Sequence, residues 1–168
     1  MIKMDIRPLC EKDAPYMLEW MHDADLTKDL KKDFASTTLE DAKKFISYAS
    51  QSLPSDLHMA IVNDEDEYMG TVSLKHIHDG AAEFGIAVRR CATGKGFSAF
   101  GMKRILEYGV DELGLNNIFW CVDPVNARAV RFYDKNGYER VASDSLDLDG
   151  LGYEEDEISK FVWYSYRR

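Results

Sequence analysis

The sequence contains few cysteines, and those few are widely spaced. Cys10, Cys91 and Cys121 are odd in number and form no Cys-x-x-Cys pair. A disulfide framework needs paired cysteines, and a structural zinc site needs closely spaced thiolate or imidazole ligands. We therefore expect neither a disulfide nor a bound metal, and a reducing, cytoplasmic setting.

Two further absences exclude other classes of protein. No stretch approaches the roughly 20 apolar residues that a membrane-spanning helix needs, and MIKMDIRPLCEKD lacks the apolar core and cleavage site of a signal peptide. Positive charge is also scarce, because the net charge is −9. Binding to a phosphate backbone needs a basic face. We therefore expect no membrane partner and no nucleic-acid partner.

The composition is that of an ordinary globular domain, with 45% hydrophobic and 30% charged residues. A chain of 168 residues suits one domain. It can bury roughly two thirds of the surface of its unfolded form, so it needs no covalent staple. No internal repeat or linker divides it, and we expect a single domain over residues 1–168.

The basic residues that are present gather in one segment. Residues 89–106 contain no acidic side chain and five basic ones, which are Arg89, Arg90, Lys95, Lys103 and Arg104. In so acidic a chain, this segment favours a binding site for an anionic ligand. A solvated basic patch is the alternative. The glycine loop within the same segment favours the ligand.

In the first half of the chain, the pattern of apolar residues predicts helices followed by an antiparallel meander. Alternating apolar residues predict four strands, at residues 2–9, 57–63, 68–78 and 81–88. Capping residues predict helices at residues 13–22 and 37–52. Between them, charges of alternating sign fit a short, solvated polar helix at residues 25–33. The Asp79-Gly80 dipeptide is typical of a tight hairpin, so the last three strands run antiparallel in sequence order. On the third strand one face is expected to carry Val72, Leu74, His76 and His78.

The second half follows a different pattern. An apolar stripe predicts a helix over residues 97–113, and a continuous apolar run predicts a buried strand over 117–122. Asn126 caps a helix that ends at Gly137. Two final strands, 138–148 and 158–166, are expected on either side of an acidic turn region. The fold class is therefore α+β, with a meander followed by a βαβ unit.

The loop Gly94-Lys95-Gly96 lies between a strand and a helix, where free backbone N–H groups and the helix dipole favour an anion. A phosphate-binding P-loop needs Ser or Thr directly after its lysine. Here Gly96 follows Lys95, so that interpretation fails. A dinucleotide fingerprint is formally satisfied by Gly94, Gly96 and Ala99, with Asp123 as the ribose-binding acid. The preceding strands are antiparallel, however, and no second βαβ half is available for a nicotinamide.

The chain resembles the GNAT family of acetyl-CoA-dependent N-acetyltransferases over essentially its whole length. One matching block is Asn126-x-x-Ala129-x-x-Phe132-Tyr133-x-x-x-Gly137-Tyr138. The family's cofactor loop, Arg/Gln-x-x-Gly-x-Gly/Ala, falls on residues 93–98, where Gly96 matches and Thr93 and Ser98 depart. The resemblance implies a mostly antiparallel central sheet flanked by helices, with a splayed βαβ site for acetyl-CoA.

The resemblance also implies which residues hold acetyl-CoA. Backbone groups of Ile86 and Val88 are expected along the pantetheine arm, and Asn126 on its other side. The pyrophosphate is expected at the loop, with Arg90 supplying charge. The cofactor-binding residues are then Ile86, Val88, Arg89, Arg90, Thr93, Gly94, Lys95, Gly96, Phe97, Ser98 and Asn126.

Acetyl transfer to an amine needs a base for the ammonium proton and an acid for the leaving sulfur. By resemblance Tyr133 is the candidate acid, a core tyrosine being the alternative. Glu83 is the candidate base, directly or through water, because it is the only acid of residues 81–88. Asp123 is a second carboxylate candidate. An exposed strand glutamate is the alternative for Glu83.

Acceptor residues are expected from the first helices and the C-terminal hairpin, and His76 on the strand 68–78 is a further candidate. The segment Trp20 to Asp23 resembles amino-sugar and ribosomal-protein N-acetyltransferases, and HIHDGAAEFGI resembles polyamine N-acetyltransferases. The candidate acceptor-binding residues are Trp20, His22 and His76. The acceptor is then an amino sugar, a polyamine or a protein N-terminus, and the protein a monomer or homodimer. The alternative function is a non-catalytic acyl-CoA-binding module of the same fold.

Overall fold

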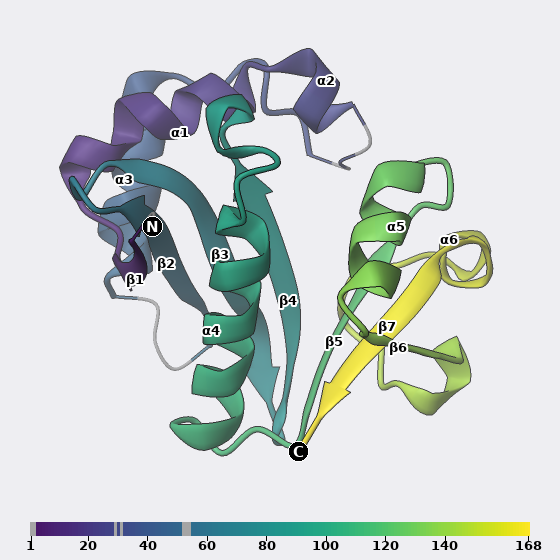
Figure 1. Cartoon of the computed structure of the whole chain (residues 1–168). Coiled ribbons are helices and arrows are strands. Elements are labelled where there is room, and N and C mark those ends of the chain that lie inside the picture. The colour runs from purple at the N-terminus through teal and green to yellow at the C-terminus, as the bar shows by residue number, and fades with distance from the viewer. Residues whose placement is uncertain (1–2, 29, 31, 52–54) are drawn as a thin grey trace.

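The computed structural model describes residues 3–28, 30, 32–51 and 55–168, and Figure 1 shows its architecture. All described strands belong to one sheet of seven strands in the order β1-β2-β3-β4-β5-β7-β6. Their bounds are β1 Met4–Pro8, β2 Leu57–Asn63, β3 Tyr68–His78, β4 Ala81–Val88, β5 Asn117–Val122, β6 Glu139–Val141 and β7 Val162–Arg167. Every neighbouring pair is antiparallel except β4 and β5, which are parallel. The predicted mixed, mostly antiparallel α+β class is confirmed.

Six α-helices accompany the sheet in the described residues. They are α1 Ala14–Met21, α2 Ala24–Thr27, α3 Leu39–Ala49, α4 Phe97–Asp111, α5 Ala127–Lys135 and α6 Glu155–Lys160. Two of them begin at the capping residues that the sequence predicts. Asp41 N donates to Thr38 Oγ1 at 3.1 Å at the start of α3, and Ala129 N donates to Asn126 Oδ1 at 3.2 Å at the start of α5.

The helices cover both faces of the sheet and create two cores (Figure 1). Side chains of α4 and α5 pack on one face, around Leu74, Phe84 and Trp120. Side chains of α1 and α3 pack on the other face, around Ala60 and Tyr68. Because successive strand residues point to opposite faces, the central strands β2, β3 and β4 contribute to both cores.

Two glycines let α4 lie close against the sheet. A Cβ atom at Gly101 would lie 2.4 Å from Ile61 Cδ1, and one at Gly109 would lie 2.8 Å from Ile118 Cδ1. Both separations are too short for a real carbon contact. The glycines therefore fix the distance between α4 and the sheet, and with it the place where α4 begins beside β4.

Three predicted elements differ from the structure. Residues 158–160 belong to helix α6 rather than to the last strand, because Glu154 N donates to Glu157 Oε1 in a capping box and acidic side chains fill the first turn. The strand predicted over 138–148 is shortened to β6, since residues 143–145 form a 3₁₀ turn closed by Ser145 Oγ on Ala142 O. The helix predicted over 25–33 is shorter in the structure, where it is the four-residue helix α2. Asp29 and Lys31 of that prediction, and Ile2 of the first predicted strand, lie outside the described residues.

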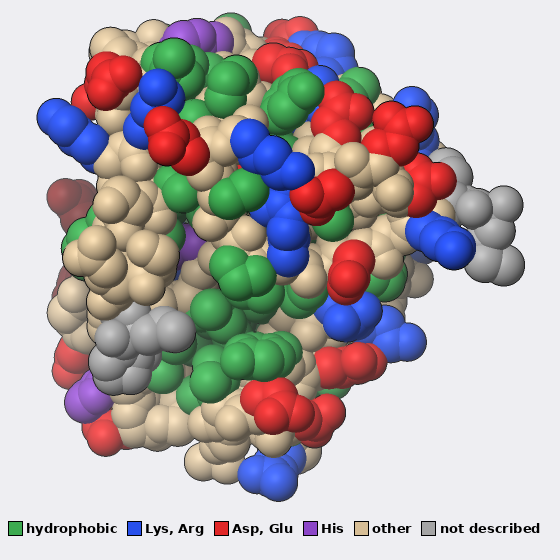
Figure 2. Space-filling model, turned by 90° about the vertical axis from the view of Figure 1, so that its left-hand side faces the viewer, with side chains coloured by type: hydrophobic (Ala, Val, Ile, Leu, Met, Phe, Trp, Pro, Cys, Tyr) green, Lys and Arg blue, Asp and Glu red, His purple; other side chains and the backbone are tan. Residues whose placement is uncertain are grey.

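The surface carries charges of both signs. Figure 2 shows the face seen from the left-hand side of Figure 1, on which acidic and basic side chains are interspersed and hydrophobic side chains lie between them. Among the described residues, no helix is long and apolar enough to cross a membrane.

Candidate active site

The parallel strands β4 and β5 pair over only three residues. The partners are Ala81 with Asn117, Ala82 with Ile118 and Glu83 with Phe119. Beyond that point the strands separate, with β3, β4 and α4 on one side and β5, β7 and α5 on the other (Figure 1). We refer to residues 84–88 and 120–122, which lie beyond the last pair, as the splay, and to the pair Glu83–Phe119 as its apex.

Backbone groups of β4 face the splay. Arg89 N donates to Met69 O of β3 at 2.9 Å. In an antiparallel ladder, alternate residues direct both backbone groups to the partner strand and the residues between them direct theirs away. Ala87 is therefore in phase with Arg89, while Ile86 and Val88 direct N–H and C=O away from β3. These are the two residues expected along the pantetheine arm.

The loop before α4 presents unpaired backbone N–H groups. Within the described part of the chain, no hydrogen bond uses the amides of residues 94–98. Gly94 and Gly96 have φ values of 76° and 90°, a left-handed conformation that favours glycine. The Phe97 side chain is buried in the core, so this residue offers its amide alone. Thr93 N, in contrast, already donates to Arg90 O at 3.1 Å.

Arg89, which is expected in the cofactor site, makes its contacts within the fold. Its guanidinium donates to Glu67 Oε1 at 3.0 Å and to Glu19 Oε2 at 2.9 Å, and it stacks on the Tyr16 ring at 4.4 Å. Its backbone amide is also taken by Met69 O, so the guanidinium ends and the amide of Arg89 are occupied by the protein itself. Sequence reasoning missed this because both carboxylates come from distant segments.

Arg90 is exposed but paired. Its Nε lies 2.8 Å from Asp23 Oδ2, and a terminal nitrogen lies 3.2 Å from Asp25 Oδ2. The guanidinium lowers the pKa of the Asp23 carboxyl below its usual range. These contacts attach α2 to the loop before α4. Lys95 is also exposed, and no described carboxylate lies within ion-pair distance of it.

Glu83 lies at the apex and is only 6% exposed. Its neighbour Phe84 belongs to the core under α4, so Glu83 points to the opposite face of the sheet. One carboxylate oxygen, Oε2, accepts a hydrogen bond from the Tyr153 hydroxyl at 2.5 Å. The other, Oε1, lies 3.8 Å from Lys75 Nζ and 4.0 Å from His76 Nε2. The alternative of an exposed strand glutamate is therefore excluded by its burial.

His76 reaches the apex through an irregularity of β3. The register of β3 and β4 shifts between Lys75 and His78, and His76 has a φ of 53°. Ile77, one residue later, packs against the same core as Leu74. The predicted shared face of Val72, Leu74, His76 and His78 is therefore wrong, because the bulge turns His76 away from that face and toward Glu83.

Tyr133 lies on the opposite face from Glu83, in α5. Its ring contacts Trp120 and Tyr164, with centroid distances of 5.5 and 5.1 Å. Burial raises the pKa of its phenol, and Tyr164 and the Cys121 thiol add to the shift. Among the described residues, its hydroxyl has no hydrogen-bond partner. Tyr133 is thus a protonated phenol at neutral pH, on the helix that follows β5.

Asp123 and Asn126 are largely used by local structure. Asp123 pairs with Lys160 Nζ at 3.0 Å and accepts from Val125 N, and these contacts lower its pKa. Asn126 Oδ1 caps α5 by accepting from Ala129 N. The side-chain nitrogen of Asn126, Nδ2, has no partner among the described residues. Of the two carboxylates proposed as base, Glu83 alone lies at the apex.

The expected acceptor residues Trp20 and His22 are not brought to the apex by any contact. Trp20 is buried, and its Nε1 donates to the Tyr68 hydroxyl at 3.0 Å. His22 is exposed, and its Nε2 lies 2.7 Å from Thr37 O. Both belong to the α1 side of the molecule. Among the described residues, no group of three or more His, Cys, Asp or Glu side chains is arranged to hold a metal ion.

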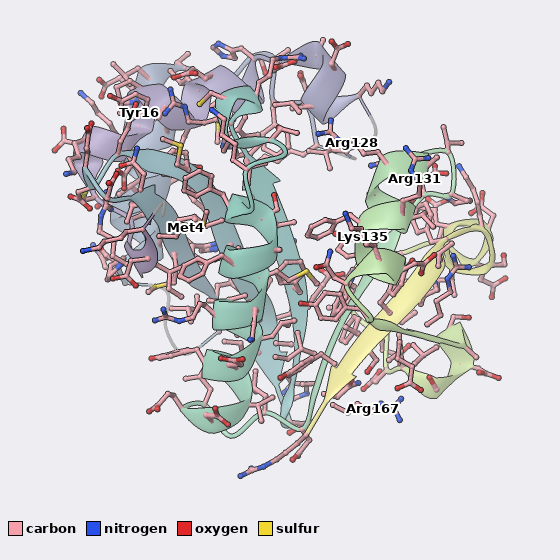
Figure 3. All side chains as sticks on the ribbon, in the orientation of Figure 1. Met4, Tyr16, Arg128, Arg131, Lys135 and Arg167 are labelled. Carbon is pink, nitrogen blue, oxygen red and sulfur yellow. The ribbon has the colours of Figure 1, made fainter. Side chains whose placement is uncertain are left out.

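Two sets of residues were missed by sequence reasoning. Tyr153 contacts Glu83 from a segment 70 residues away, and no local pattern indicates it. The second set is Arg128, Arg131 and Lys135 of α5, which Figure 3 labels. These cations are exposed and have no described ion-pair partner. In the sequence, their spacing of three and four residues was the available signal that they share one face of a helix.

Comparison with known proteins agrees with this geometry. Residues 3–139 match the family model described as an acetyltransferase (GNAT) domain. A relative from Bacillus licheniformis, named as uncharacterized N-acetyltransferase p20, is 25% identical over 82% of this chain and 80% of its own length. The probable N-acetyltransferase YjcK of Bacillus subtilis is 29% identical over 68% of this chain and 67% of its own length.

Solved structures share the fold. A spermidine N-acetyltransferase from Vibrio cholerae, crystallised with CoA and spermine, superposes with a TM-score of 0.77 at 17% identity, over 98% of this chain and 95% of that chain. A GNAT-family acetyltransferase from Bacillus anthracis gives 0.76 at 19% identity, over the same shares. The splayed sheet, the matched domain and the named relatives together place the chain in the GNAT family, as an N-acetyltransferase.

Proposed function

We propose that the protein transfers an acetyl group from acetyl-CoA to a primary amine by direct attack of the amine on the thioester. The observation that carries this proposal is the end of β4–β5 pairing at Glu83 and Phe119. The separation leaves the backbone of Ile86 and Val88 facing the splay, with a buried carboxylate at its apex. The pantetheine arm, bound along this backbone, would therefore end beside a proton acceptor at the apex.

The residues present suit acetyl-CoA. Backbone groups of Ile86 and Val88 hold the pantetheine arm, as an added strand would be held. The amides of residues 94–98 and the positive end of α4 bind the pyrophosphate. The cations of α5 and Lys95 add positive charge, and the free amide nitrogen of Asn126 contacts the arm from the β5 side. Arg89 is left out, because Glu19 and Glu67 occupy it.

The catalytic steps follow from the two faces of the splay. When bound, acetyl-CoA supplies the acetyl group as an activated thioester. Glu83 accepts a proton from the acceptor's ammonium, directly or through water, so that the amine becomes a nucleophile. Tyr133, whose raised pKa keeps its phenol protonated, donates to the leaving sulfur. The two groups approach from opposite faces, so the acceptor and the leaving group do not compete for one place.

The acceptor is a primary amine, and three classes are to be compared: polyamines, amino sugars and protein N-termini. The carboxylate of Glu83 favours a cationic amine. Because the Vibrio cholerae protein is a spermidine N-acetyltransferase, polyamines are the first class to test. His76 at the apex is the residue best placed to contact this acceptor.

The test is a panel of amines from these classes, with release of free CoA thiol and the mass of the product both measured. We expect acetylated product from at least one class, with saturation in both substrates. Tight CoA binding without acetylation of any acceptor would contradict the proposal, and would identify a non-catalytic acyl-CoA-binding module.

A further inference from the structure

Tyr153 lies outside the region that matches the family model, which ends at residue 139. It belongs to the segment between β6 and α6, yet its hydroxyl donates to Glu83 Oε2 at 2.5 Å. Its ring is held by Trp163, at a centroid distance of 5.2 Å, and by Phe161, at 6.3 Å. Both contacts are close to perpendicular. The hydroxyl therefore has a fixed position at the apex.

The charged and titratable groups around Glu83 come from three elements. Lys75 and His76 of β3 lie near Oε1, at 3.8 and 4.0 Å. Cys121 of β5 donates to the Tyr153 hydroxyl at 3.4 Å. The Glu83 carboxylate and Glu157 of α6 both raise the pKa of the Cys121 thiol, after burial as the main cause. The phenol oxygen thus accepts a hydrogen bond from the Cys121 thiol, and the hydroxyl donates one to Glu83.

We propose that Tyr153 is a positioning residue, which holds Oε2 of Glu83 and leaves Oε1 as the oxygen that takes the proton of the acceptor amine. This inference rests on the proposed role of Glu83 as base. Tyr153 donates to Oε2, whereas Lys75 Nζ and His76 Nε2 lie 3.8 and 4.0 Å from Oε1, beyond hydrogen-bond distance. Oε1 thus keeps a lone pair for the proton of the acceptor amine. The C-terminal segment thereby forms part of the catalytic apex.

The proposal has a consequence for pH dependence. A hydrogen bond to the ionised carboxylate stabilises that form relative to the neutral acid. Replacing Tyr153 with Phe removes the donor and keeps the ring between Trp163 and Phe161. The acid limb of kcat/KM for the amine is then expected to move to higher pH.

The experiment compares Tyr153→Phe with Tyr68→Phe, a matched control in which the lost hydroxyl lies 2.5 Å from Thr71 Oγ1 and accepts from Trp20 Nε1, away from the apex. The first readout is the pH profile of kcat/KM for the amine. The second is the ¹³C titration of the Glu83 carboxyl by NMR, with its resonance assigned through Glu83→Gln. The NMR readout does not depend on turnover.

We expect both readouts to move upward in Tyr153→Phe and neither to move in Tyr68→Phe, with turnover of Tyr153→Phe approaching wild type at high pH. An unmoved titration, or an activity loss equal at every pH, overturns the proposal. If Tyr153→Phe melts early, Cys121→Ala weakens the same hydrogen bond, and its Glu83 titration is expected to move in the same direction by less. A wild type without transferase activity contradicts the proposed function, while the titration still decides whether Tyr153 holds Glu83.

Discussion

Replacing Glu83 with Gln tests the proposed base with the smallest change of shape. The amide oxygen introduced by Glu83→Gln can still accept from the Tyr153 hydroxyl, which lies 2.5 Å from Oε2 of the carboxylate. The substitution therefore removes the charge and the ability to take a proton, and little else. Because the site is 6% exposed, bulk water does not readily take over that role.

The expected magnitude follows from the contribution of a positioned base, which is about 10²–10⁴-fold. We expect kcat/KM for the amine to fall roughly 10²–10³-fold near pH 7, since some proton transfer through water survives. The dissociation constant of CoA should stay within about twofold, because Ile86, Val88 and the loop amides are untouched. The deficit should narrow as pH rises toward the acceptor's own pKa, where the amine is already neutral.

The assay is continuous detection of free CoA thiol at several pH values, with the acetylated product confirmed by mass. Cys91 is exposed and would react with a thiol reagent, so each variant is prepared in a Cys91→Ser background. Asp123→Asn is the matched control, because this carboxylate is occupied by Lys160 and Val125. It is expected to turn over like the parent protein.

Wild-type turnover of Glu83→Gln across the pH range would refute the assignment of the base. A large loss in Asp123→Asn, with Glu83→Gln unaffected, would move the base to the end of β5. Equal loss of CoA binding and turnover in Glu83→Gln would instead indicate a disturbed site, and the melting temperature of the variant distinguishes that case.

Three further outcomes are expected. Tyr133→Phe should lower kcat about 10–100-fold with CoA affinity within about twofold, and kcat unchanged by this substitution would exclude Tyr133 as the acid. Arg89→Met should lower the free energy of unfolding by about 1–3 kcal/mol, a value discounted for the partial exposure of Glu19 and Glu67. Its KM for acetyl-CoA should not change, and a tenfold rise at unchanged stability would return Arg89 to the cofactor site. Burial raises the pKa of Cys121 to about 11, so at pH 8 its thiolate fraction is about 10⁻³. Alkylation followed by mass spectrometry should then label Cys91 and spare Cys121, and equal labelling would contradict the buried contact with Tyr153.

Local features of the sequence predicted local structure well. The Thr38 and Asn126 caps each act within three residues, so the residues that form them are neighbours in the chain. The Asp79-Gly80 hairpin has positive φ at both positions, 48° and 78°, as a tight type I′ turn requires. The same local signals located the loop before α4.

Features that depend on distant segments could not be predicted. Arg89 lies in a basic segment of the sequence, whereas its partners, Glu19 and Glu67, are 70 and 22 residues away. The bulge at His76 replaces simple alternation because its amide donates to Asp56 Oδ1 from outside the ladder, at 2.9 Å. The contact of Tyr153 with Glu83 also joins two segments that no spacing rule connects.

The last helix was missed for a different reason. Residues 154–157 are Glu-Glu-Asp-Glu, which as a composition is typical of a solvated turn. Their arrangement is that of a helix start, because Glu157 caps the amide of Glu154 and acidic side chains favour the positive end of a helix. Order within the acidic run, rather than its charge, was the informative signal.

A crystal structure of the protein with CoA and a non-reactive amine is the most direct test of the account. We expect the pantetheine arm between β4 and β5 along Ile86 and Val88, the pyrophosphate on the amides of residues 94–98, and the sulfur within reach of the Tyr133 hydroxyl. The amine nitrogen should lie on the Oε1 side of Glu83. CoA bound elsewhere, or an amine that approaches from the α5 face, would contradict the assignment of the splay as the site of acetyl transfer.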